Sequence, residues 1–404
     1  MNTARRGAWR SACLLIAAGL TLPVAAGEVK VANRNELNAA LQRAEAGDVI
    51  LLAPGAYPGG VAATGLRGRQ GQPVVIAAAD PDHPPVITGG ASGLQLSSPQ
   101  HVEIRGLAFA GANGNGLNID DGGDVDAPAR HVVVRHVTVR DIGPAGNCDG
   151  IKLSGVEDFQ VLDCRLERWG SGGSAIDMVG CRRGLIQGCC LVGRGGEQAS
   201  GIQTKGGTSR IAIRRCRIVD AGARGVNIGG STGLDYFRPP DAPFEARDIA
   251  VEDCEIIGGH AAVAFVGVDG ATVRHNTIYR PQTWAVRILQ ETVAERFVPC
   301  RRGVFAKNLV LFRSDELRRV FNVGDNTDPQ SFQFADNAWS CLDKPDETEQ
   351  LVNLPAPEQR GVYGPPPPLA DPQSGDFTLR NRRPDDPGAR TRSEPDRPKP
   401  GTRM

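Results

Sequence analysis

The sequence predicts an all-β fold, a right-handed parallel β-helix (solenoid) with a short N-terminal capping helix. Two observations favour it: short alternations of apolar and polar residues recur in two interleaved series, and glycine-rich turns separate them. The first series is GLQLSS (from 93), GLNIDD (116), GIKLSG (150), AIDMVG (175), GIQTKG (201), GVNIGG (225), AVAFVG (262) and AVRILQ (285). The second is IRGLAF (104), VRHVTV (134), LDCRLE (162), IQGCCL (186), IRRCRI (213), VEDCEI (251), VRHNTI (273) and FAKNLV (305).

The first 26 residues have the layout of a cleaved secretory signal. Arg5, Arg6 and Arg10 precede an apolar run over residues 12–22, and small residues lead to a predicted cleavage after Ala26. That run is too short for a membrane span, and no later segment is long enough. We therefore expect an exported protein, secreted or periplasmic, with no membrane span.

The remaining chain is predicted to form one solenoid and an extension. Residues 35–46, NELNAALQRAEA, are the one helical pattern, and a helix there suits a cap over the open end of the first coil. The β-helix is predicted over residues 27–350. Residues 351–389 are predicted to be a C-terminal extension whose residues 375–389 are a candidate terminal coil, and the proline-rich, charged residues 390–404 a disordered tail.

The composition narrows the possible partners. The 46 Lys and Arg residues balance 46 Asp and Glu residues, so no field of the whole molecule attracts an anionic partner, and nucleic acid is not expected as a ligand. With 51 glycines and only 5% aromatic residues, the predicted core is aliphatic and rich in turns. We expect a monomer.

Four cysteines align in one column of the second series. Cys164, Cys189, Cys216 and Cys254 occupy successive coils, and asparagines follow at the next two. Neighbouring rungs are ~4.8 Å apart, a spacing that allows metal or disulfide bonds, but small buried hydrophobic side chains are the favoured interpretation. Outside the column, Cys300 and Cys341 are the predicted disulfide.

Alternation along the first series sends two columns of side chains outward. The first column contains Gln95, Asn118, Lys152, Asp177, Gln203, Asn227, Ala264 and Arg287. The second contains Ser97, Asp120, Ser154, Val179, Lys205, Gly229, Val266 and Leu289. A first column that stays polar over many coils favours a functional surface, although amide ladders also stabilise solenoids.

The two lysines of these columns have different predicted roles. Lys152 is adjacent to Asp177 and is expected to form a salt bridge with it. Lys205 has no carboxylate on the adjacent rungs of its column, and Arg224 begins the next coil, so its pKa is expected to fall toward that of a general base at neutral pH. The alternative is that Lys205 is a solvated surface lysine.

An insertion follows the Asn227 rung. Residues 231–245, STGLDYFRPPDAPFE, contain Tyr236, Phe237 and Arg238, and such rings and a cation suit stacking on a sugar and pairing with its carboxylate. Alternatively, the loop only covers hydrophobic surface.

Clustered carboxylates suggest a Ca²⁺ site, because Ca²⁺ takes six to eight oxygen ligands. The segment IDDGGDVDA carries four of them, and the next coils add Asp149 and Asp177. The spacing is not that of an EF-hand loop, and a solvated acidic turn is the alternative.

Four segments carry a resemblance to a known family: ELNAALQRAEAGDVILLAPGAY, QPVVIAAADPDHPPVITGG, HVEIRGLAFAG and TKGGTSRIAIRRCRI. Through them, over roughly residues 28–290, the chain resembles chondroitinase-B-like and alginate polysaccharide lyases. The last is similar to the family segment that holds the catalytic lysine, which implies that Lys205 is the Brønsted base. The DGIKL and AIDMV coils also resemble β-helix pectate lyases that bind Ca²⁺ through aspartates.

This sequence departs from the family pattern at two places. In the family, an arginine on the next coil and a calcium held by Asn and Glu residues neutralise the uronate carboxylate. Here NIGG stands in the place of that arginine, which leaves Arg224 or Arg287 as substitutes. Glu197 is the one glutamate in the few residues before Lys205, which weakens the case for calcium of the family type.

The functional hypothesis is β-elimination on a uronic-acid polysaccharide, an anionic substrate. Lys205 is the expected base, and Tyr236 the expected acid for the leaving oxygen. Arg224 with Arg287, or Ca²⁺ held by Asp149 and Asp177, would neutralise the carboxylate. The predicted substrate-binding residues are Lys152, Gln203, Asn227, Arg238 and Arg287.

Two alternatives stay open. One is a β-helix glycoside hydrolase or C5-epimerase, since Asp149 and Asp177 are candidate paired carboxylates and an epimerase shares the proton abstraction. The other is a noncatalytic carbohydrate-binding protein, for which Lys205 would be dispensable.

Overall fold

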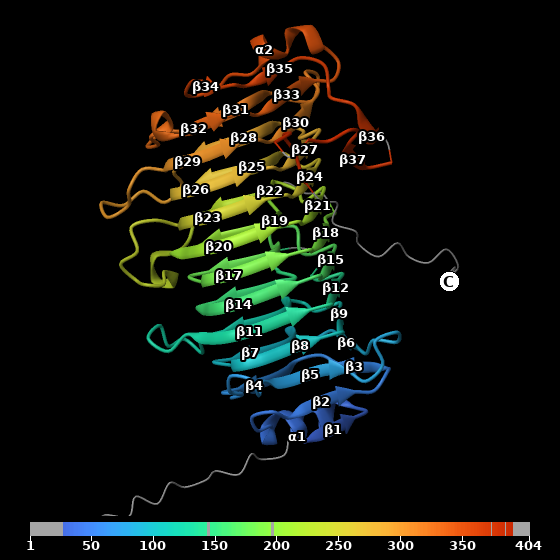
Figure 1. Ribbon diagram of the computed structural model, residues 1–404. Coiled ribbons are helices and arrows are strands. Elements are labelled where there is room, and N and C mark those ends of the chain that lie inside the picture. Colours follow the sequence, from blue (N-terminus) through green and yellow to red (C-terminus); the bar gives the residue numbers. More distant parts are fainter. Residues whose placement is uncertain (1–26, 144–145, 195–197, 373, 384, 391–404) are drawn as a thin grey trace, which may run out of the picture.

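Three long parallel sheets, stacked coil upon coil, build the protein (Figure 1). The computed structural model describes residues 27–143, 146–194, 198–372, 374–383 and 385–390. Within them the chain passes from sheet C to sheet A to sheet B and then begins the next coil, so that each strand pairs in parallel with its counterpart one coil away. This confirms the predicted parallel β-helix. The predicted signal segment, Glu197 and residues 391–404 lie outside the described residues.

The sheets are defined by their strands. Sheet A contains β1 (Glu28–Val31), β2 (Val49–Leu52), β5 (Val74–Ala78), β8 (Gln100–Arg105), β11 (Ala129–Arg135), β14 (Val156–Leu162), β17 (Arg182–Gln187), β20 (Thr208–Arg214), β23 (Ala246–Glu252), β26 (Val268–Arg274), β29 (Arg301–Ala306), β32 (Gln333–Ala335) and β34 (Glu358–Gln359). Sheet B contains β3 (Ala56–Pro58), β6 (Val86–Thr88), β9 (Ala108–Ala110), β12 (Thr138–Arg140), β15 (Arg165–Glu167), β18 (Cys190–Val192), β21 (Arg217–Val219), β24 (Glu255–Ile257), β27 (Thr277–Tyr279), β30 (Leu309–Phe312), β33 (Ala338–Cys341) and β35 (Val362–Tyr363). Sheet C contains β4 (Val61–Thr64), β7 (Ser92–Ser97), β10 (Asn115–Asp120), β13 (Ile151–Ser154), β16 (Ser174–Val179), β19 (Ser200–Lys205), β22 (Arg224–Gly229), β25 (Ala261–Val266), β28 (Trp284–Leu289) and β31 (Arg319–Val323).

A helix closes the N-terminal end, as predicted, although it is shorter than residues 35–46. It is α1 (Arg34–Arg43), and it begins where the Asn33 side chain accepts a hydrogen bond from Glu36 N at 3.0 Å, while the Glu36 carboxylate accepts one from Ala32 N at 2.7 Å. Leu37 and Leu41 are its buried residues and join the main core. The other helical segments are η1 (Leu234–Tyr236), η2 (Pro329–Ser331), η3 (Pro345–Glu347) and α2 (Thr348–Leu351). Of the described helices, none has the length and apolar character needed to cross a bilayer.

One continuous core fills the solenoid from α1 to the last coils. In sheet C the inward positions are aliphatic, as in Ile151, Ile176, Ile202 and Val226, which stack on successive rungs. Burying such columns is the main favourable contribution to folding in an aliphatic solenoid.

At the corner between sheets A and B, a column of cysteines continues into a column of asparagines. Cys164, Cys189, Cys216 and Cys254 are free and buried, as the favoured interpretation predicted. Beyond them, Asn276 donates from Nδ2 to Asn308 Oδ1 at 3.0 Å, and Asn308 donates to Asn337 Oδ1 at 3.1 Å. These amides also form hydrogen bonds with backbone groups of neighbouring coils. They therefore satisfy backbone atoms of the turn to which thiols bond only weakly.

The predicted disulfide between Cys300 and Cys341 is wrong, because both thiols are free. Cys300 precedes β29 of sheet A and donates to Phe265 O at 3.5 Å, and burial raises the pKa of its thiol to about 12. Cys341 ends β33 of sheet B and donates to Asp343 Oδ1 at 3.2 Å. Cys300 therefore adjoins sheet A, whereas Cys341 lies in sheet B.

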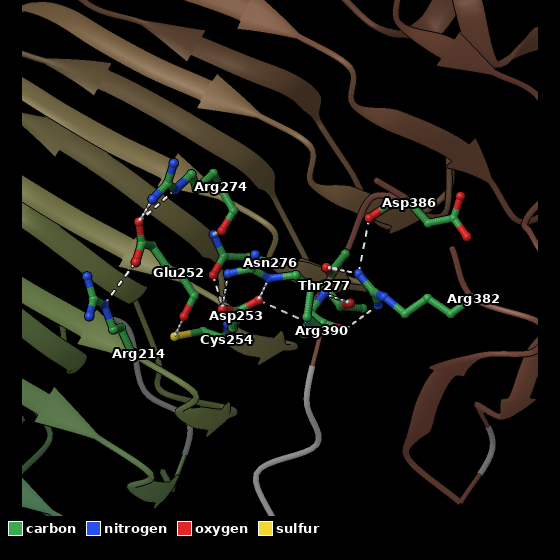
Figure 2. A network of polar contacts seen from close by, with 12 residues as sticks. Arg214, Glu252, Asp253, Cys254, Arg274, Asn276, Thr277, Arg382, Asp386 and Arg390 are labelled. Atoms are coloured by element: carbon green, nitrogen blue, oxygen red, sulfur yellow. Dashed lines mark hydrogen bonds and ion pairs between the residues drawn. The ribbon is translucent and has the colours of Figure 1, made fainter. Parts of the chain in front are cut away.

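The C-terminal segment runs back along the outside of the solenoid instead of adding a terminal coil. After β34 and β35, which extend sheets A and B past residue 350, an antiparallel hairpin of β36 (Leu369–Asp371) and β37 (Asp376–Leu379) lies beside sheet B (Figure 1). Phe377 packs on Tyr279 with ring centroids 4.6 Å apart. Figure 2 shows Arg390 beside Asp253, to which it is bonded at 2.7 Å.

We predict that Asn308→Ala lowers the free energy of unfolding by about 3 kcal/mol, because it leaves buried backbone and amide groups without partners. Cys216→Ala, at an equivalent buried position of the same column, is the matched control and should cost about 1 kcal/mol. Urea denaturation followed by circular dichroism measures both. Equal losses would show that the column acts through side-chain volume and not through hydrogen bonds.

Candidate active site

The outer face of sheet C brings together the predicted polar column. Lys152, Asp177, Gln203 and Asn227 are register partners on β13, β16, β19 and β22. Lys205 ends β19, one rung from Val179. All five residues therefore lie on one wall, as the alternation predicted, but Asp177 and Asn227 are 0% and 1% exposed and do not face open solvent.

At the centre of this wall, two lysines and two aspartates form a compact charged cluster. Lys152 Nζ donates to Asp149 Oδ2 at 3.0 Å and also to Asp177 Oδ2, which confirms the predicted Lys152–Asp177 salt bridge. Lys205 Nζ lies 3.3 Å from the other Asp177 oxygen, Oδ1. That oxygen is buried and accepts no hydrogen bond from any described residue, so the contact with Lys205 is an ion pair without hydrogen-bond geometry.

Burial shifts the protonation of the cluster. For Asp149, desolvation is the largest cause and the neighbouring Asp177 adds to it, so its pKa is raised. For Lys152, burial alone would lower the pKa, but the two carboxylates outweigh that effect and raise it. Lys152 is therefore the fixed cation of the cluster.

The column of Lys205 holds no carboxylate on the adjacent rungs, as predicted, but a carboxylate of the neighbouring column does contact it. Asp177 belongs to the adjoining column, yet a lysine side chain is long enough to reach across one rung diagonally. Lys205 is neither an isolated amine nor a solvated surface lysine, because its side chain is only 16% exposed.

The predicted Ca²⁺ ligands do not fit a divalent cation. Lys152 Nζ already bridges Asp149 and Asp177, and the remaining Asp149 oxygen accepts Ser174 N at 2.7 Å. The described residues include no group of three or more His, Cys, Asp or Glu side chains that could hold a metal. We therefore derive no step through calcium.

The insertion lies along a row of glycines beside the cluster. Gly155, Gly180 and Gly206 all have positive φ, and a Cβ atom at Gly180 would come within 2.4 Å of Arg238 Cβ. The backbone N–H of Arg238 donates to Gly206 O at 3.0 Å, which places the loop directly next to Lys205.

Arg238, a predicted substrate-binding residue, is used instead to hold the insertion. Its guanidinium forms a two-pronged ion pair with Asp121, which is 1% exposed and belongs to the turn after β10. Phe237 is also buried and packs against Phe297 and Phe244 in a small core of its own. Of the three aromatic and cationic side chains, only Tyr236, 65% exposed, is free to meet a ligand.

Glu245 joins two loops beneath Lys205, a role that the sequence did not indicate. Its fully buried carboxylate accepts Gly206 N at 2.8 Å, Thr232 N at 2.8 Å, Thr232 Oγ1 at 2.7 Å and also Thr292 Oγ1. The residue after Lys205, the start of the insertion and the loop after β28 thus converge on one carboxylate. Nothing in the local pattern distinguishes this glutamate from a solvated one.

Arginines dominate the wall on the C-terminal side of Lys205. Arg224 donates to Asn227 Oδ1 at 3.3 Å and forms an ion pair with Glu291. Arg287 lies over the Trp284 ring at 4.2 Å and donates to Asn322 Oδ1 at 2.9 Å. Burial, and then the neighbouring Arg224, lower the pKa of Arg287. Trp284 was missed by sequence reasoning, because alternation from the buried Val286 predicts an inward side chain at this position, yet its ring lies against Arg287.

Comparisons with known proteins confirm the fold. A family model described as a right handed beta helix region matches residues 92–236, which include Lys152, Asp177, Lys205 and Arg224. No curated protein sequence matches the chain.

Solved structures with the same fold act on polysaccharides, according to their names. They include the A-module of a mannuronan C-5 epimerase from Azotobacter vinelandii (TM-score 0.53, 15% identity, 82% of this chain and 95% of that one). Others are a rhamnogalacturonan lyase (0.52, 13%, 74% and 82%) and the pectate lyase Pel9A (0.51, 13%, 77% and 80%). At these identities the similarity is one of fold.

We predict that Lys152→Met destabilises the protein by about 3–5 kcal/mol at neutral pH, because two buried carboxylates lose their shared cation. Asp149, with its folded-state pKa raised above the unfolded value, would then bind its proton more tightly in the folded chain. Stability of the variant should therefore fall as the pH rises from about 4 toward 7. Urea denaturation at several pH values measures this. Lys344→Met, which removes an exposed pair with Glu347, is the control and should change stability by less than about 0.5 kcal/mol.

A second prediction concerns the insertion. Arg238→Met leaves Asp121 buried without its cation, so residues 231–245 should detach and be cut faster in limited proteolysis, by about tenfold or more. The control is Arg313→Met, which removes a surface pair with Asp315. An unchanged cleavage rate in the insertion would mean that the glycine row and Glu245 suffice to hold it.

Proposed function

We propose that the protein is a polysaccharide lyase that cleaves a uronic-acid-containing polymer by β-elimination, with Lys205 as the base. One observation carries the proposal: Lys205 Nζ lies on the outer wall of sheet C against a carboxylate oxygen, Asp177 Oδ1, that accepts no hydrogen bond from the described residues. The amine is therefore held at a defined position on the wall, and Asp177 stays paired with Lys152 when Lys205 is neutral, which suits Lys205 to the role of a base.

In its neutral form, Lys205 takes the proton from C5 of the uronate, and Lys152 remains as the cation between Asp149 and Asp177. The electron pair forms the C4–C5 double bond as the bond from C4 to the leaving oxygen breaks. Tyr236 is the proposed acid for that oxygen, because its exposed side chain belongs to the loop bonded to Gly206, next to Lys205.

Neutralisation of the substrate carboxylate is assigned to Arg224 and not to calcium. The Arg224 guanidinium donates to Asn227, which lies one rung from Gln203. A uronate whose C5 lies at Lys205 could therefore place its carboxylate against Arg224. The negative charge that develops on C5 and its carboxylate during abstraction is stabilised by such a cation. Gln203 is the proposed partner of a sugar hydroxyl, whereas Asn227, a predicted substrate-binding residue, is buried and holds Arg224 instead.

The fold supports a polysaccharide as the substrate. Parallel β-helix proteins of known structure include pectate and rhamnogalacturonan lyases and a mannuronan C-5 epimerase, and stacked rungs offer an extended polymer repeated contacts. We also propose that the protein works outside the cytoplasm, in line with the signal predicted over residues 1–26.

A C5-epimerase is the second candidate, because it uses the same proton abstraction and one such enzyme shares this fold. Hydrolysis is less favoured, since Asp149 and Asp177 are both buried and both bonded to Lys152, which leaves neither positioned to activate water. A noncatalytic sugar-binding protein would retain its affinity without Lys205.

We predict that the protein releases an unsaturated product from a uronate polymer, detected by ultraviolet absorbance, and that Lys205→Met reduces the rate at least about 100-fold. Lys307→Met, which alters an exposed pair with Asp385, is the matched control and should keep the wild-type rate. The panel should contain polygalacturonate, polymannuronate and polyguluronate. Inversion at C5 detected by NMR without absorbance would assign an epimerase. Reducing ends without absorbance would assign a hydrolase, and binding without turnover would contradict catalysis.

A further inference from the structure

Arg287 stands apart from the other cations of the wall in its position. From Gln203, the register runs through Asn227 and Ala264 to Arg287, so three rungs separate them. At ~4.8 Å a rung, the separation is roughly 14 Å. This is too far for Arg287 to reach the carboxylate of a sugar whose C5 lies at Lys205, and that predicted role for Arg287 is not supported.

Arg287 also differs in its partners. Lys152, Lys205, Arg224 and Arg238 each form an ion pair with a carboxylate. In the part of the chain that the structure describes, Arg287 forms none: its contacts are the Trp284 ring and Asn322 Oδ1, and the nearby Glu291 is bound to Arg224. The guanidinium is half-buried beside another guanidinium, which is unfavourable until an anion joins it.

The contacts of Arg287 hold its guanidinium in an orientation that suits the binding of a planar anion. Trp284 supports one face of the guanidinium, and Asn322 holds Nε, so the side chain is fixed with its remaining donors available. Between the rungs of Arg224 and Arg287, the only residue of the first column is Ala264, which is small and fully buried. An extended chain of hexoses advances by about one rung a unit, ~4.8 Å, so a polymer at Lys205 would bring a later unit to Arg287.

We propose that Arg287, held by Trp284 and Asn322, is a distal subsite that binds the carboxylate of a sugar about three units from the one at Lys205. The inference rests on the proposed function and deepens it: the preferred substrate carries acidic sugars in uninterrupted runs, and affinity rises in a step once an oligomer spans both positions.

The test measures binding without turnover. Oligogalacturonates and oligomannuronates of defined length, from dimers to hexamers, are titrated into the Lys205→Met protein by calorimetry, with neutral cello-oligosaccharides as comparators. We expect affinity for one acidic series to rise about 10- to 100-fold between the trimer and the pentamer, the size of one charge-assisted contact. Adding Arg287→Gln should abolish this step and leave the shortest oligomers unchanged, whereas adding Arg313→Gln, at a surface pair with Asp315, should preserve it.

Each result bears on the subsite separately from the lyase activity. A step that depends on Arg287 supports the subsite even if no polymer is cleaved. A smooth rise with length, an equal step for neutral oligomers, or a loss that includes the shortest oligomers would overturn it, even if the lyase activity is found. In a catalytically active background, Arg287→Gln should raise KM for long substrates and leave kcat unchanged, because the residue does not touch the reacting unit. If Arg287→Gln lowers the affinity by the same factor for oligomers of every length, Arg287 acts only on the structure of the wall, and this too would contradict the subsite.

Discussion

The in-register parallel pairing of successive coils is the constraint on which the rest of this structure depends. It places side chains that are 25 and 24 residues apart in sequence next to each other on adjacent rungs of one wall, as the pairings of Lys152 with Asp177 and Gln203 with Asn227 show. A slip of one residue would exchange inward and outward positions along a whole strand, and an aliphatic core as continuous as this one does not permit it. The wall is therefore as rigid as the core beneath it.

Such stacking brings like charges close together, and neighbouring side chains of opposite charge neutralise them. Asp149 and Asp177 would repel each other if Lys152 did not lie between them, and Asp177 is shared with Lys205. The same principle organises the loops, because the buried carboxylates of Asp121 and Glu245 accept the bonds that hold the insertion in place. Charged groups thus position the flexible parts of the molecule, while apolar columns position the strands.

The strands, the capping helix, the outward columns and the Lys152–Asp177 pair could be predicted because each depends on local alternation or on adjacency between coils. The contact of Lys205 with Asp177 could not, since it joins two columns diagonally and depends on side-chain length. The pairing of Arg238 with Asp121 could not be predicted for a different reason: no periodic pattern in the sequence indicates the path of a long insertion over the surface. The return of the β36–β37 hairpin and of Arg390 along sheet B was missed likewise, because it rests on isolated contacts such as Arg390 with Asp253.

The cysteine column has a consequence for the unfolded chain. In the folded protein these thiols are inaccessible, and burial raises the pKa of Cys164 well above its usual value, so they resist oxidants. Once the chain is denatured, the same residues become ordinary, reactive thiols, and any disulfide formed among them must break before the free thiols of the column can form again. Recovery from denaturant therefore depends on keeping these thiols reduced, although the described cysteines of the native state form no disulfide that a reducing agent could break.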